Sequence, residues 1–578
     1  MGKTIPEKLT IKWLQEHYRN NNITPKDVIE EIIDRATKDA DMNIWITPPS
    51  MEWIQPYLEK LDSLSIESSP LWGIPFAIKD NIDLAGIPTT AGCPEYAYTP
   101  DEDAAVIRRL IEAGAIPVGK ANLDQFATGL VGTRSPYGET QNSLRPELIS
   151  GGSSSGSSVS VARGQAVFGL GTDTAGSGRV PALLNNLVGY KPSLGAWSTK
   201  GLVPACASLD CITVFAHSLE EAMLVDASAR GVEEADPWSK EIPQPVASLP
   251  EKIILPKDPL DFYGPFATEY SDAWDRAVEQ VKQVGLPIEY VDTTFLAEAA
   301  AILYDGPMVA ERWAAVGSFV EENPGATFPV TEDVLRSGSA SKYDAASVFK
   351  ANHQLQAYKL KAKQLLRDAV LVMPTAGGTW SRDQVRENPI ATNSDMGRYT
   401  NHCNLLDLSA VAVPADEAAE KVPFGVTFFS LAENEGFICG TAEAFTQVVA
   451  EPTTLVAVCG LHMRGLPLET QMKDCRATFI REAVTAPKYQ LIKLPTEPAK
   501  PGLIKQANGG GAIQLEIWEM PLSTFGTFAA SIPDPLGIGK VELEDGSEVP
   551  GFICQAYVAE GAEDITALGG WRNLLVFN

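Results

Sequence analysis

The spacing of apolar positions changes along this chain, and the first part has a helical pattern. Apolar residues between positions 28 and 33 recur at helical intervals. Just before them, Thr24 supplies an N-cap residue, Pro25 suits the first turn of a helix, and Asp27 places an acid in that turn. We therefore expect residues 1–70 to be mainly helical.

A strand pattern follows. In "WGIPFAIKDNI" the apolar residues Ile74, Phe76 and Ile78 alternate, which predicts a strand that ends at Lys79. Helical and strand patterns then take turns, as in "SSVSVARGQAVFGLG", where a short helix, a glycine stop and a strand follow one another. This order is typical of the α/β class, a mixed β-sheet covered by helices. We expect such a domain over residues 1–450.

The pattern changes again near residue 450. Short apolar segments such as "EPTTLVAVCG", "KYQLIKLP" and "GGGAIQLEIWEMP" are separated by glycine and proline turns, with few helical stretches between them. We expect a second, smaller β-rich domain over residues 453–578. Two or three domains also suit a chain of 578 residues, which is too long for one compact core.

Composition and charge narrow the range of functions. An apolar content of 44% with 21% charged residues is typical of a globular protein. The formal net charge of −28 argues against nucleic-acid or anionic-membrane partners, because these need a basic surface. The stretch "MGKTIPEKLTIKWLQEHYRN" lacks the apolar core of a secretory signal. We expect a cytoplasmic protein that binds neither nucleic acid nor membranes.

Cysteine and histidine content argues against metal chemistry. The eight cysteines include no C-x-x-C pair, a pattern that predicts reduced and mostly buried thiols in a long chain. The five histidines include no H-E-x-x-H motif. We expect no metal and no cofactor.

Two motifs imitate other enzyme classes. "GSSSG", from Gly152 to Gly156, has the form G-x-S-x-G, but "SLRPELISGG" before it is a poor strand, whereas a nucleophile elbow follows a strand directly. "GLGTDTAG", from Gly169, begins like a dinucleotide fingerprint but lacks the third glycine. We expect neither an α/β-hydrolase nor a dinucleotide-binding protein.

Three other segments carry the candidate chemistry. "GIPFAIKDNID" places Lys79 at a strand end, "GGSSSGSSVSVA" carries Ser153, and "FGLGTDTAGSGRVPA" carries Ser177. Together they resemble the amidase signature family. The resemblance implies Ser177 as nucleophile, Ser153 as a bridging serine preceded by a cis peptide bond, and Lys79 as base. Two departures replace small residues by small residues: Ala175-Gly176 stands for the family's double glycine, and "SSSGS" for its "SSGGS".

The residue types suit this chemistry. A serine hydroxyl is a weak nucleophile, and a lysine, with an ordinary pKa of about 10.4, acts as a base only when burial or a nearby cation keeps it neutral. Lys79 faces a Gly/Ser loop, and Asp80 should point to the opposite face of the strand. We therefore expect Asp80 to leave Lys79 without an acidic partner.

The small residues before the nucleophile let backbone N–H groups approach a substrate oxygen. Thr174, Ala175 and Gly176 are the oxyanion-hole candidates, and each such donor contributes roughly 3–4 kcal/mol. Asp173 and Arg179 are expected to brace this loop rather than contact the substrate.

Further stretches resemble the allophanate hydrolases within that family. They include "LDQFATGLVGTRSPYG", "LYDGPMVAERWAAV", "CGLHMRGLPLETQM" and "IPDPLGIGKVELEDG", so the resemblance covers nearly the full length. It implies attack on the terminal carboxamide of allophanate, a carboxylated urea, with loss of ammonia. The N-carboxycarbamate that forms then loses carbon dioxide.

Allophanate is an anion, so its site needs a cation. We expect Pro307 at the first position of a helix, with Tyr304 just before that helix and Arg312 about one and a half turns inside it. A guanidinium and a phenol suit a planar carboxylate. The resemblance assigns the clamp to the same two residues and adds a backbone contact near Gly129. The alternative is a core tyrosine and an arginine paired with helix neighbours of Glu311.

The resemblance also extends to the C-terminal domain and to partners. This domain resembles a γ-glutamylcyclotransferase-like fold, with "VAVCGLHMRG" as its glycine loop. The family implies that it speeds decarboxylation, with His462 in a small pocket, while a purely structural His462 is the alternative. It also implies a homodimer and a biotin-dependent urea carboxylase that supplies allophanate. The rival functions are a general small-amide amidase and the amidase component of a tRNA amidotransferase.

Overall fold

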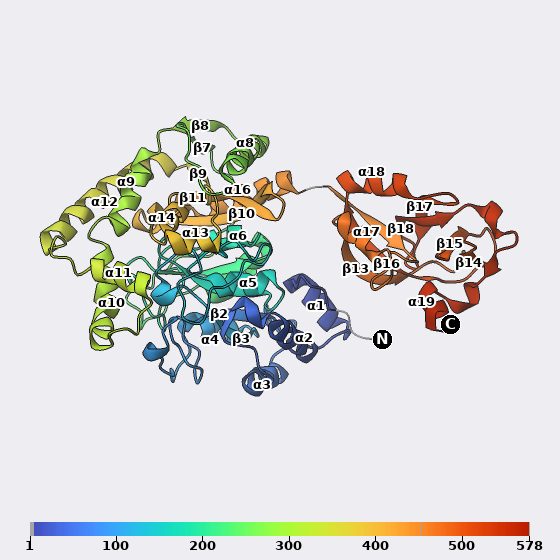
Figure 1. Cartoon of the computed structure of the whole chain (residues 1–578), viewed down its shortest axis with the longest axis horizontal. Helices are drawn as coiled ribbons and strands as arrows, with labels where there is room; N and C mark the ends of the chain where they lie inside the picture. Colours follow the sequence, from blue (N-terminus) through green and yellow to red (C-terminus); the bar gives the residue numbers. More distant parts are fainter. Residues whose placement is uncertain (1–4, 451, 577–578) are drawn as a thin grey trace. The chain divides into compact units, whose positions relative to one another are not determined.

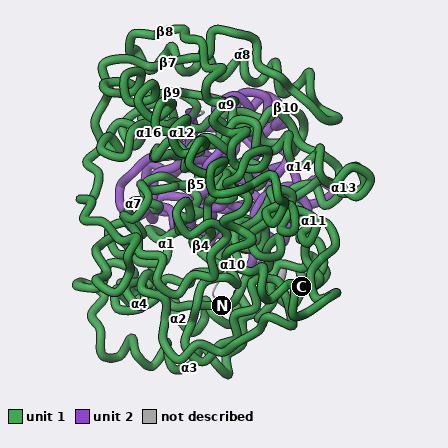
Figure 2. Tube along the Cα trace, turned by 90° about the vertical axis from the view of Figure 1, so that its left-hand side faces the viewer, with its two compact units in different colours: residues 1–449 green, residues 450–578 purple. Residues whose placement is uncertain are grey.

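The computed structural model describes residues 5–450 and 452–576 of the chain, which is drawn in Figure 1. Contacts between residues divide the chain into two units, Met1–Val449 and Ala450–Asn578, which have different colours in Figure 2. In the described parts of the chain, no helix is both long enough and apolar enough to span a membrane.

One sheet of eleven strands forms the centre of the first unit. Its order is β1-β3-β2-β4-β6-β5-β10-β11-β9-β7-β8. The strands are β1 (Trp45–Thr47), β2 (Pro75–Lys79), β3 (Ile116–Ala121), β4 (Phe168–Asp173), β5 (Val188–Lys191), β6 (Cys211–Ala216), β7 (Lys252–Pro256), β8 (Ile288–Val291), β9 (Ala369–Pro374), β10 (Leu408–Ala419) and β11 (Val422–Leu431). Strand β2 runs parallel to β3 and β4, whereas β4 and β6 are antiparallel. The predicted mixed α/β sheet is confirmed.

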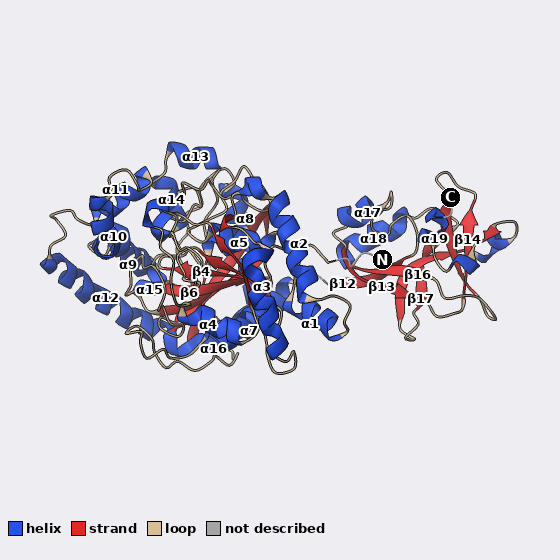
Figure 3. Cartoon of the chain, turned by 90° about the horizontal axis from the view of Figure 1, so that it is seen from below, coloured by secondary structure: helices blue, strands red, loops and turns tan. Residues whose placement is uncertain are grey.

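Helices surround this sheet (Figure 3). They are α1 (Ile11–Arg19), α2 (Pro25–Lys38), α3 (Met51–Lys60), α4 (Ala105–Glu112), α5 (Ser155–Ala162), α6 (Val180–Leu184), α7 (Leu219–Ala229), α8 (Ala267–Gln283), α9 (Thr294–Tyr304), α10 (Val309–Glu322), α11 (Pro329–Ser337), α12 (Ala345–Leu366), α13 (Arg382–Glu387), α14 (Ala391–Met396), α15 (His402–Leu405) and α16 (Glu435–Val449). Helices α5 and α6 contact each other and the sheet, and α7, α8 and α16 form a second contacting group on it.

The first 70 residues are mainly helical, as predicted, with one short exception. Helix α2 begins as its cap residues indicate: the Thr24 hydroxyl accepts a hydrogen bond from the backbone N–H of Asp27, and Pro25 is its first residue. The exception is β1, which pairs with β3 at the edge of the large sheet. This pairing partner lies about seventy residues away, at Lys120 and Ala121, so no local pattern reveals it.

The second unit contains two smaller sheets. Their orders are β13-β16-β12-β18-β17 and β15-β14-β19. The strands are β12 (Thr453–Val458), β13 (Thr478–Val484), β14 (Tyr489–Leu494), β15 (Lys500–Lys505), β16 (Gln514–Pro521), β17 (Leu536–Glu542), β18 (Glu548–Cys554) and β19 (Glu563–Asp564); the helices are α17 (Glu469–Asp474), α18 (Leu522–Ser531) and α19 (Trp571–Val576). The predicted smaller β-rich C-terminal part is confirmed.

The second unit has a hydrophobic core of its own, which includes Val456, Leu491, Ile517 and Phe552. We therefore expect a fragment of residues 450–578 to unfold in one cooperative thermal transition, measured by circular dichroism. Ile517→Ala should lower the free energy of unfolding by about 2–5 kcal/mol, because it opens a cavity in the core.

The matched control is Leu455→Ala on the neighbouring strand β12, where the side chain is 38% exposed and should matter far less. A fragment that unfolds gradually, or responds equally to both substitutions, would contradict an independent core.

Candidate active site

Lys79 is the last residue of β2, and its side chain is fully buried at 0% exposure. Because β2 and β4 are parallel neighbours, with Ile78 opposite Leu170, their carboxyl ends lie at the same edge of the sheet. The Lys79 Nζ atom lies 2.7 Å from Ser153 Oγ and 2.6 Å from Thr172 Oγ1, both hydrogen-bond distances. Two of the predicted residues, Lys79 and Ser153, are thus in direct contact.

Thr172 is a contact that no motif predicts. It lies on β4, five positions before Ser177, and gives the lysine a second hydroxyl partner. A threonine at the end of a buried strand is ordinary, so only the spacing to the nucleophile candidate could have indicated it.

Burial sets the protonation of Lys79. Burial lowers the pKa of Lys79 to about 7. The carboxylates of Asp124, Asp210 and Asp173 act in the opposite direction, because they favour the charged form. The Arg312 guanidinium lowers the pKa further. A substantial fraction of the lysine is therefore neutral near pH 7. Asp80 does not contribute an ion pair to it.

Asp80 instead pairs with another strand residue. Its carboxylate lies 3.1 Å from Lys120 Nζ, and both side chains are fully buried. The prediction that Asp80 points away from Lys79 is confirmed, and the strand end therefore presents a lysine without a carboxylate partner of its own.

Ser153 lies in a tightly packed loop before α5. The peptide bond between Gly152 and Ser153 is cis. A side chain at Gly152 would collide with the Asp124 carboxylate, and the Ser153 carbonyl accepts a hydrogen bond of 3.0 Å from the Asp124 backbone N–H. Only glycine fits before this serine.

Ser177 lies in the loop between β4 and α6 and is 4% exposed. Arg179 donates two hydrogen bonds, of 2.8 and 3.0 Å, to the Asp173 carboxylate, and both side chains are fully buried. Asn404 donates a further bond of 2.7 Å to the Asp173 carbonyl. Asp173 and Arg179 brace the loop, as predicted.

The backbone around the nucleophile candidate offers free donors. Within the described residues, the N–H groups of Thr174, Ala175, Gly176 and Ser177 have no hydrogen-bond acceptor. Gly176 has a φ of +146°, and a side chain there would collide with Thr400. These four amides can therefore donate to a developing oxyanion.

Asp210 is a second residue that the sequence analysis does not single out. Its carboxylate accepts hydrogen bonds from the Thr174 hydroxyl at 2.5 Å and from the backbone N–H groups of Ala205 and Cys206. Burial raises the pKa of Asp210 to about 6 in spite of these donors. Asp210 thus fixes one side chain of the oxyanion loop.

The structure brings Tyr304 and Arg312 together. Arg312 is 1% exposed, and it donates hydrogen bonds of 3.0 Å to the Tyr304 hydroxyl and 3.1 Å to Thr128 Oγ1. The predicted helix start is wrong, because α10 begins at Val309 and Tyr304 is the last residue of α9. Pro307 lies in a turn before the helix, where its carbonyl accepts from the backbone N–H of Ala310.

Arg312 has no ion-pair partner among the described residues. Its neighbour Glu311 accepts hydrogen bonds from Ser208 instead, at 2.8 Å from the backbone N–H and 2.7 Å from the hydroxyl. The alternative in which Arg312 pairs with acids of its own helix is therefore wrong. A buried guanidinium without a carboxylate suits an anionic ligand.

Gly129 lies in a loop organised by Asp124. The Asp124 carboxylate accepts hydrogen bonds from the backbone N–H groups of Val131, Gly132 and Arg134, and a side chain at Gly129 would collide with it. The N–H of Gly129 has no acceptor in the described part of the chain.

In the second unit, His462 lines a cavity of about 360 Å³. Its Nε2 lies 3.0 Å from Gln471 Oε1, and its ring stacks on Phe552 with the centroids 4.8 Å apart. Burial lowers the pKa of His462 below its ordinary value, which favours the neutral form of the ring.

The two units of the chain match different protein families. Residues 27–439 match the amidase family, and residues 454–576 match the allophanate hydrolase C-terminal domain. The chain belongs to the amidase family.

Individual relatives resemble this amidase to different extents. It is 39% identical to urea amidolyase of Saccharomyces cerevisiae, a match that covers 97% of this chain and 32% of the relative, so the chain spans about a third of that protein. The allophanate hydrolase structure from Kluyveromyces lactis is 37% identical with a TM-score of 0.72, over 98% of this chain and 99% of that one. A glutamyl-tRNA(Gln) amidotransferase component from a Picosynechococcus species is 31% identical over 66% of this chain and 85% of its own.

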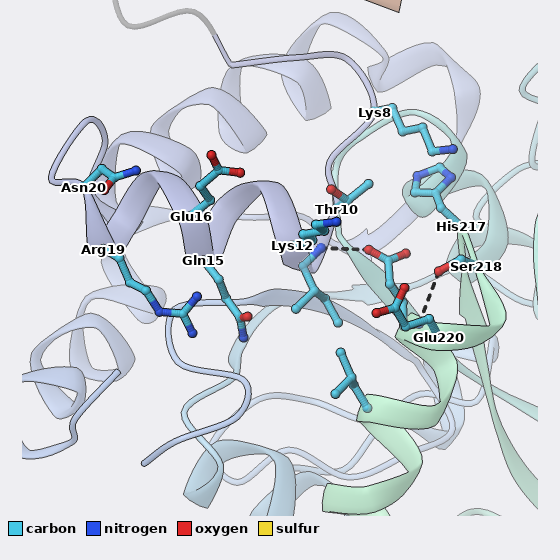
Figure 4. Close-up of a pocket in the computed structure, with 13 residues that line it drawn as sticks. Lys8, Thr10, Lys12, Gln15, Glu16, Arg19, Asn20, His217, Ser218 and Glu220 are labelled. Atoms are coloured by element: carbon cyan, nitrogen blue, oxygen red, sulfur yellow. Dashed lines mark hydrogen bonds between the residues drawn. The ribbon is translucent and has the colours of Figure 1, made fainter. Parts of the chain in front are cut away.

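The amidase unit also has a cavity of about 640 Å³ that contains none of these residues. Figure 4 shows Lys8 beside His217 at one end of the lining, with Lys12, Ser218 and Glu220 nearby. Here a buried glutamate caps a helix, since Glu221 Oε1 accepts a hydrogen bond of 2.7 Å from the backbone N–H that begins α1. The serine in its lining, Ser218, is the N-cap residue of α7 and accepts a hydrogen bond from the backbone N–H of Glu221.

We predict that amide hydrolysis by this amidase rises with pH through about pH 7, because only neutral Lys79 can accept a proton. Asp210→Asn should move this acid limb to lower pH, since the negative charge that it removes favours the ammonium form of Lys79. Lys79→Arg should be inactive at every pH, because guanidinium stays protonated. The measurement is kcat/KM for ammonia release as a function of pH.

An acid limb that stays in place in Asp210→Asn, or substantial activity in Lys79→Arg, would contradict a neutral lysine base.

Proposed function

We propose that this chain hydrolyses allophanate as the second step of urea degradation. The observation that carries the proposal is a serine–lysine amidase centre together with a buried, unpaired guanidinium, in a chain whose C-terminal unit matches the allophanate hydrolase C-terminal domain. An anion-binding amide site suits a carboxylated amide better than a neutral one.

The first half-reaction uses the strand-end lysine. Neutral Lys79 takes the hydroxyl proton of Ser153 while Ser153 takes that of Ser177, and Ser177 Oγ bonds to the terminal carboxamide carbon. The amides of residues 174–177 hold the resulting oxyanion, and the proton returns from Lys79 through Ser153 to the leaving nitrogen, which departs as ammonia. An N-carboxylated carbamoyl ester on Ser177 remains.

The second half-reaction uses the same proton transfers between Lys79, Ser153 and Ser177. Water attacks the ester carbon, its proton passes to Lys79, and Ser177 leaves with a proton returned to it. The product is N-carboxycarbamate, which carries carboxylates on both sides of one nitrogen. Loss of carbon dioxide from it and then from carbamate releases the second ammonia.

The clamp fixes which end of the substrate meets the nucleophile. Arg312 and the Tyr304 hydroxyl bind the carboxylate, with the backbone N–H of Gly129 as a further donor. Each contact is charge-assisted, so a substrate without the carboxylate forgoes hydrogen bonds that are each worth about 1.5–3 kcal/mol.

The second unit acts on the product. We propose that N-carboxycarbamate binds in the His462 cavity, where Lys500 on the cavity wall supplies a cation and the neutral imidazole supplies a proton acceptor or donor. A purely structural His462, held by Gln471 and Phe552, is the alternative that the experiment below distinguishes.

Allophanate must be supplied by another reaction that precedes this one in urea degradation. We propose a biotin-dependent urea carboxylase as the preceding enzyme, supported by the likeness to urea amidolyases, of which this chain spans about a third. A cytoplasmic homodimer is part of the same proposal. A tRNA amidotransferase component is the rival function, but a net charge of −28 and an added C-terminal domain do not suit a tRNA partner.

The substrate assignment is tested by ammonia release from allophanate, malonamate, acetamide and glutamine under the same conditions. We expect the highest kcat/KM for allophanate, and Ser177→Ala should retain below about 1% of this activity with unchanged thermal stability, because only the nucleophile is lost. Preference for glutamine would support the amidotransferase function, and preference for acetamide a general amidase.

The division of labour is tested with His462→Ala. The first ammonia should appear at the wild-type rate, while carbon dioxide and the second ammonia should lag at short times, because the intermediate then decays without help. His353→Ala, at an exposed position on α12, is the matched control. Wild-type release of carbon dioxide from His462→Ala would mean that the histidine is structural.

A further inference from the structure

A cavity of about 460 Å³ opens beside the clamp. Tyr304 forms part of its wall, so the cavity reaches the proposed carboxylate site. Its other polar lining residues include Arg134, Asp305, Asn393, Arg398 and Asn401. Arg134 differs from the other charged residues among them in its burial and in its partners.

Arg134 is a buried cation without an ion-pair partner among the described residues. Burial lowers the pKa of its guanidinium, and the Asp124 carboxylate opposes this shift only in part. It is 3% exposed, and it donates hydrogen bonds of 3.0 Å to the Thr128 carbonyl and 2.7 Å to the Pro389 carbonyl, both neutral groups. Its Nε has no hydrogen-bond partner, and no carboxylate of the described residues lies within ion-pair distance of its guanidinium. A buried charge in this state is costly unless an anion joins it.

The other arginine on this cavity has ordinary surface contacts. Arg398 is about 40% exposed at its side chain and pairs with Asp261 at 3.0 Å and Asp395 at 2.9 Å. The unpaired state of Arg134 is therefore a property of its position rather than of the cavity in general.

Arg134 and Arg312 both donate hydrogen bonds to Thr128. Arg134 donates to the Thr128 carbonyl, and Arg312 donates to the Thr128 hydroxyl at 3.1 Å. The next residue is Gly129, whose N–H has no acceptor in the described chain. Two unpaired guanidiniums and a free amide thus surround one short segment.

We propose that Arg134 is a second substrate-binding guanidinium, which holds the carboxylate of the substrate from the cavity side while Arg312 and Tyr304 hold it from the helix side. This inference rests on the proposed function, because it names a further residue of that anion site. A carboxylate has four lone-pair positions, enough for both arginines and the Gly129 amide. A neutral amide would leave both cations unpaired, which explains selectivity for anions.

The test uses malonamate, an anionic analogue of allophanate, and malonamide, its neutral isostere. Arg134→Met should weaken malonamate binding and raise KM for allophanate about tenfold to a hundredfold, with a smaller effect on kcat, because a charge-assisted contact is lost. Binding of malonamide should change by less than about twofold. Dissociation constants are measured by calorimetry or by the rise in melting temperature.

The controls separate binding from folding. Arg398→Met should leave malonamate binding unchanged, and Arg312→Met should reproduce the loss. Arg134→Lys keeps a cation without the planar fork and should weaken malonamate less than Arg134→Met does. If Arg134→Met fails to fold, Arg134→Lys is the deciding variant, because only a substrate contact makes it weaken malonamate binding while malonamide binding stays unchanged.

Equal weakening of both ligands, or unchanged malonamate binding, would overturn the inference. A wild-type enzyme that binds malonamate through Arg134 but does not hydrolyse allophanate would refute the proposed substrate and leave the anion site in place. A wild-type enzyme that hydrolyses allophanate, with an Arg134→Met variant that binds malonamate normally, would refute the inference alone.

Discussion

Removal of the Lys79 amino group from water is the constraint on which the active site depends. Three carboxylates act to keep this lysine charged, and each is occupied elsewhere: Asp173 by Arg179, Asp210 by a hydroxyl and two amides, and Asp124 by three amides. None of them forms an ion pair with the lysine, so burial remains the larger effect on its pKa. The hydrogen bonds that brace these loops thus affect the electrostatics of the candidate base as well as the geometry around the candidate nucleophile.

The sequence predicts those parts of the candidate site that lie in recognisable motifs. Three segments that resemble the amidase signature family indicate Lys79, Ser153 and Ser177 as candidates. No motif indicates Thr172 or Asp210, because threonine and aspartate are ordinary at such positions, and their roles come from contacts with distant segments.

The fold likewise depends on contacts between distant segments, which local patterns do not reveal. Alternating helix and strand patterns predict the α/β class, but strand order depends on pairs far apart in the chain, such as β5 beside β10. The helix start expected at Pro307 shows the limit locally, since proline is equally suited to the turn that precedes α10. Helix boundaries therefore need the tertiary contacts that decide between two favourable uses of one residue.

The nucleophile and base candidates are supplied by strand ends and their loops, whereas Tyr304 and Arg312 come from the end of α9 and the beginning of α10. The candidate reacting groups and these two clamp candidates therefore come from separate stretches of the chain. A change in the α9–α10 segment can alter the accepted acyl group while the reacting atoms stay where they are. On this architecture, substitutions at the end of α9 and the beginning of α10 can adapt one reaction centre to other amides.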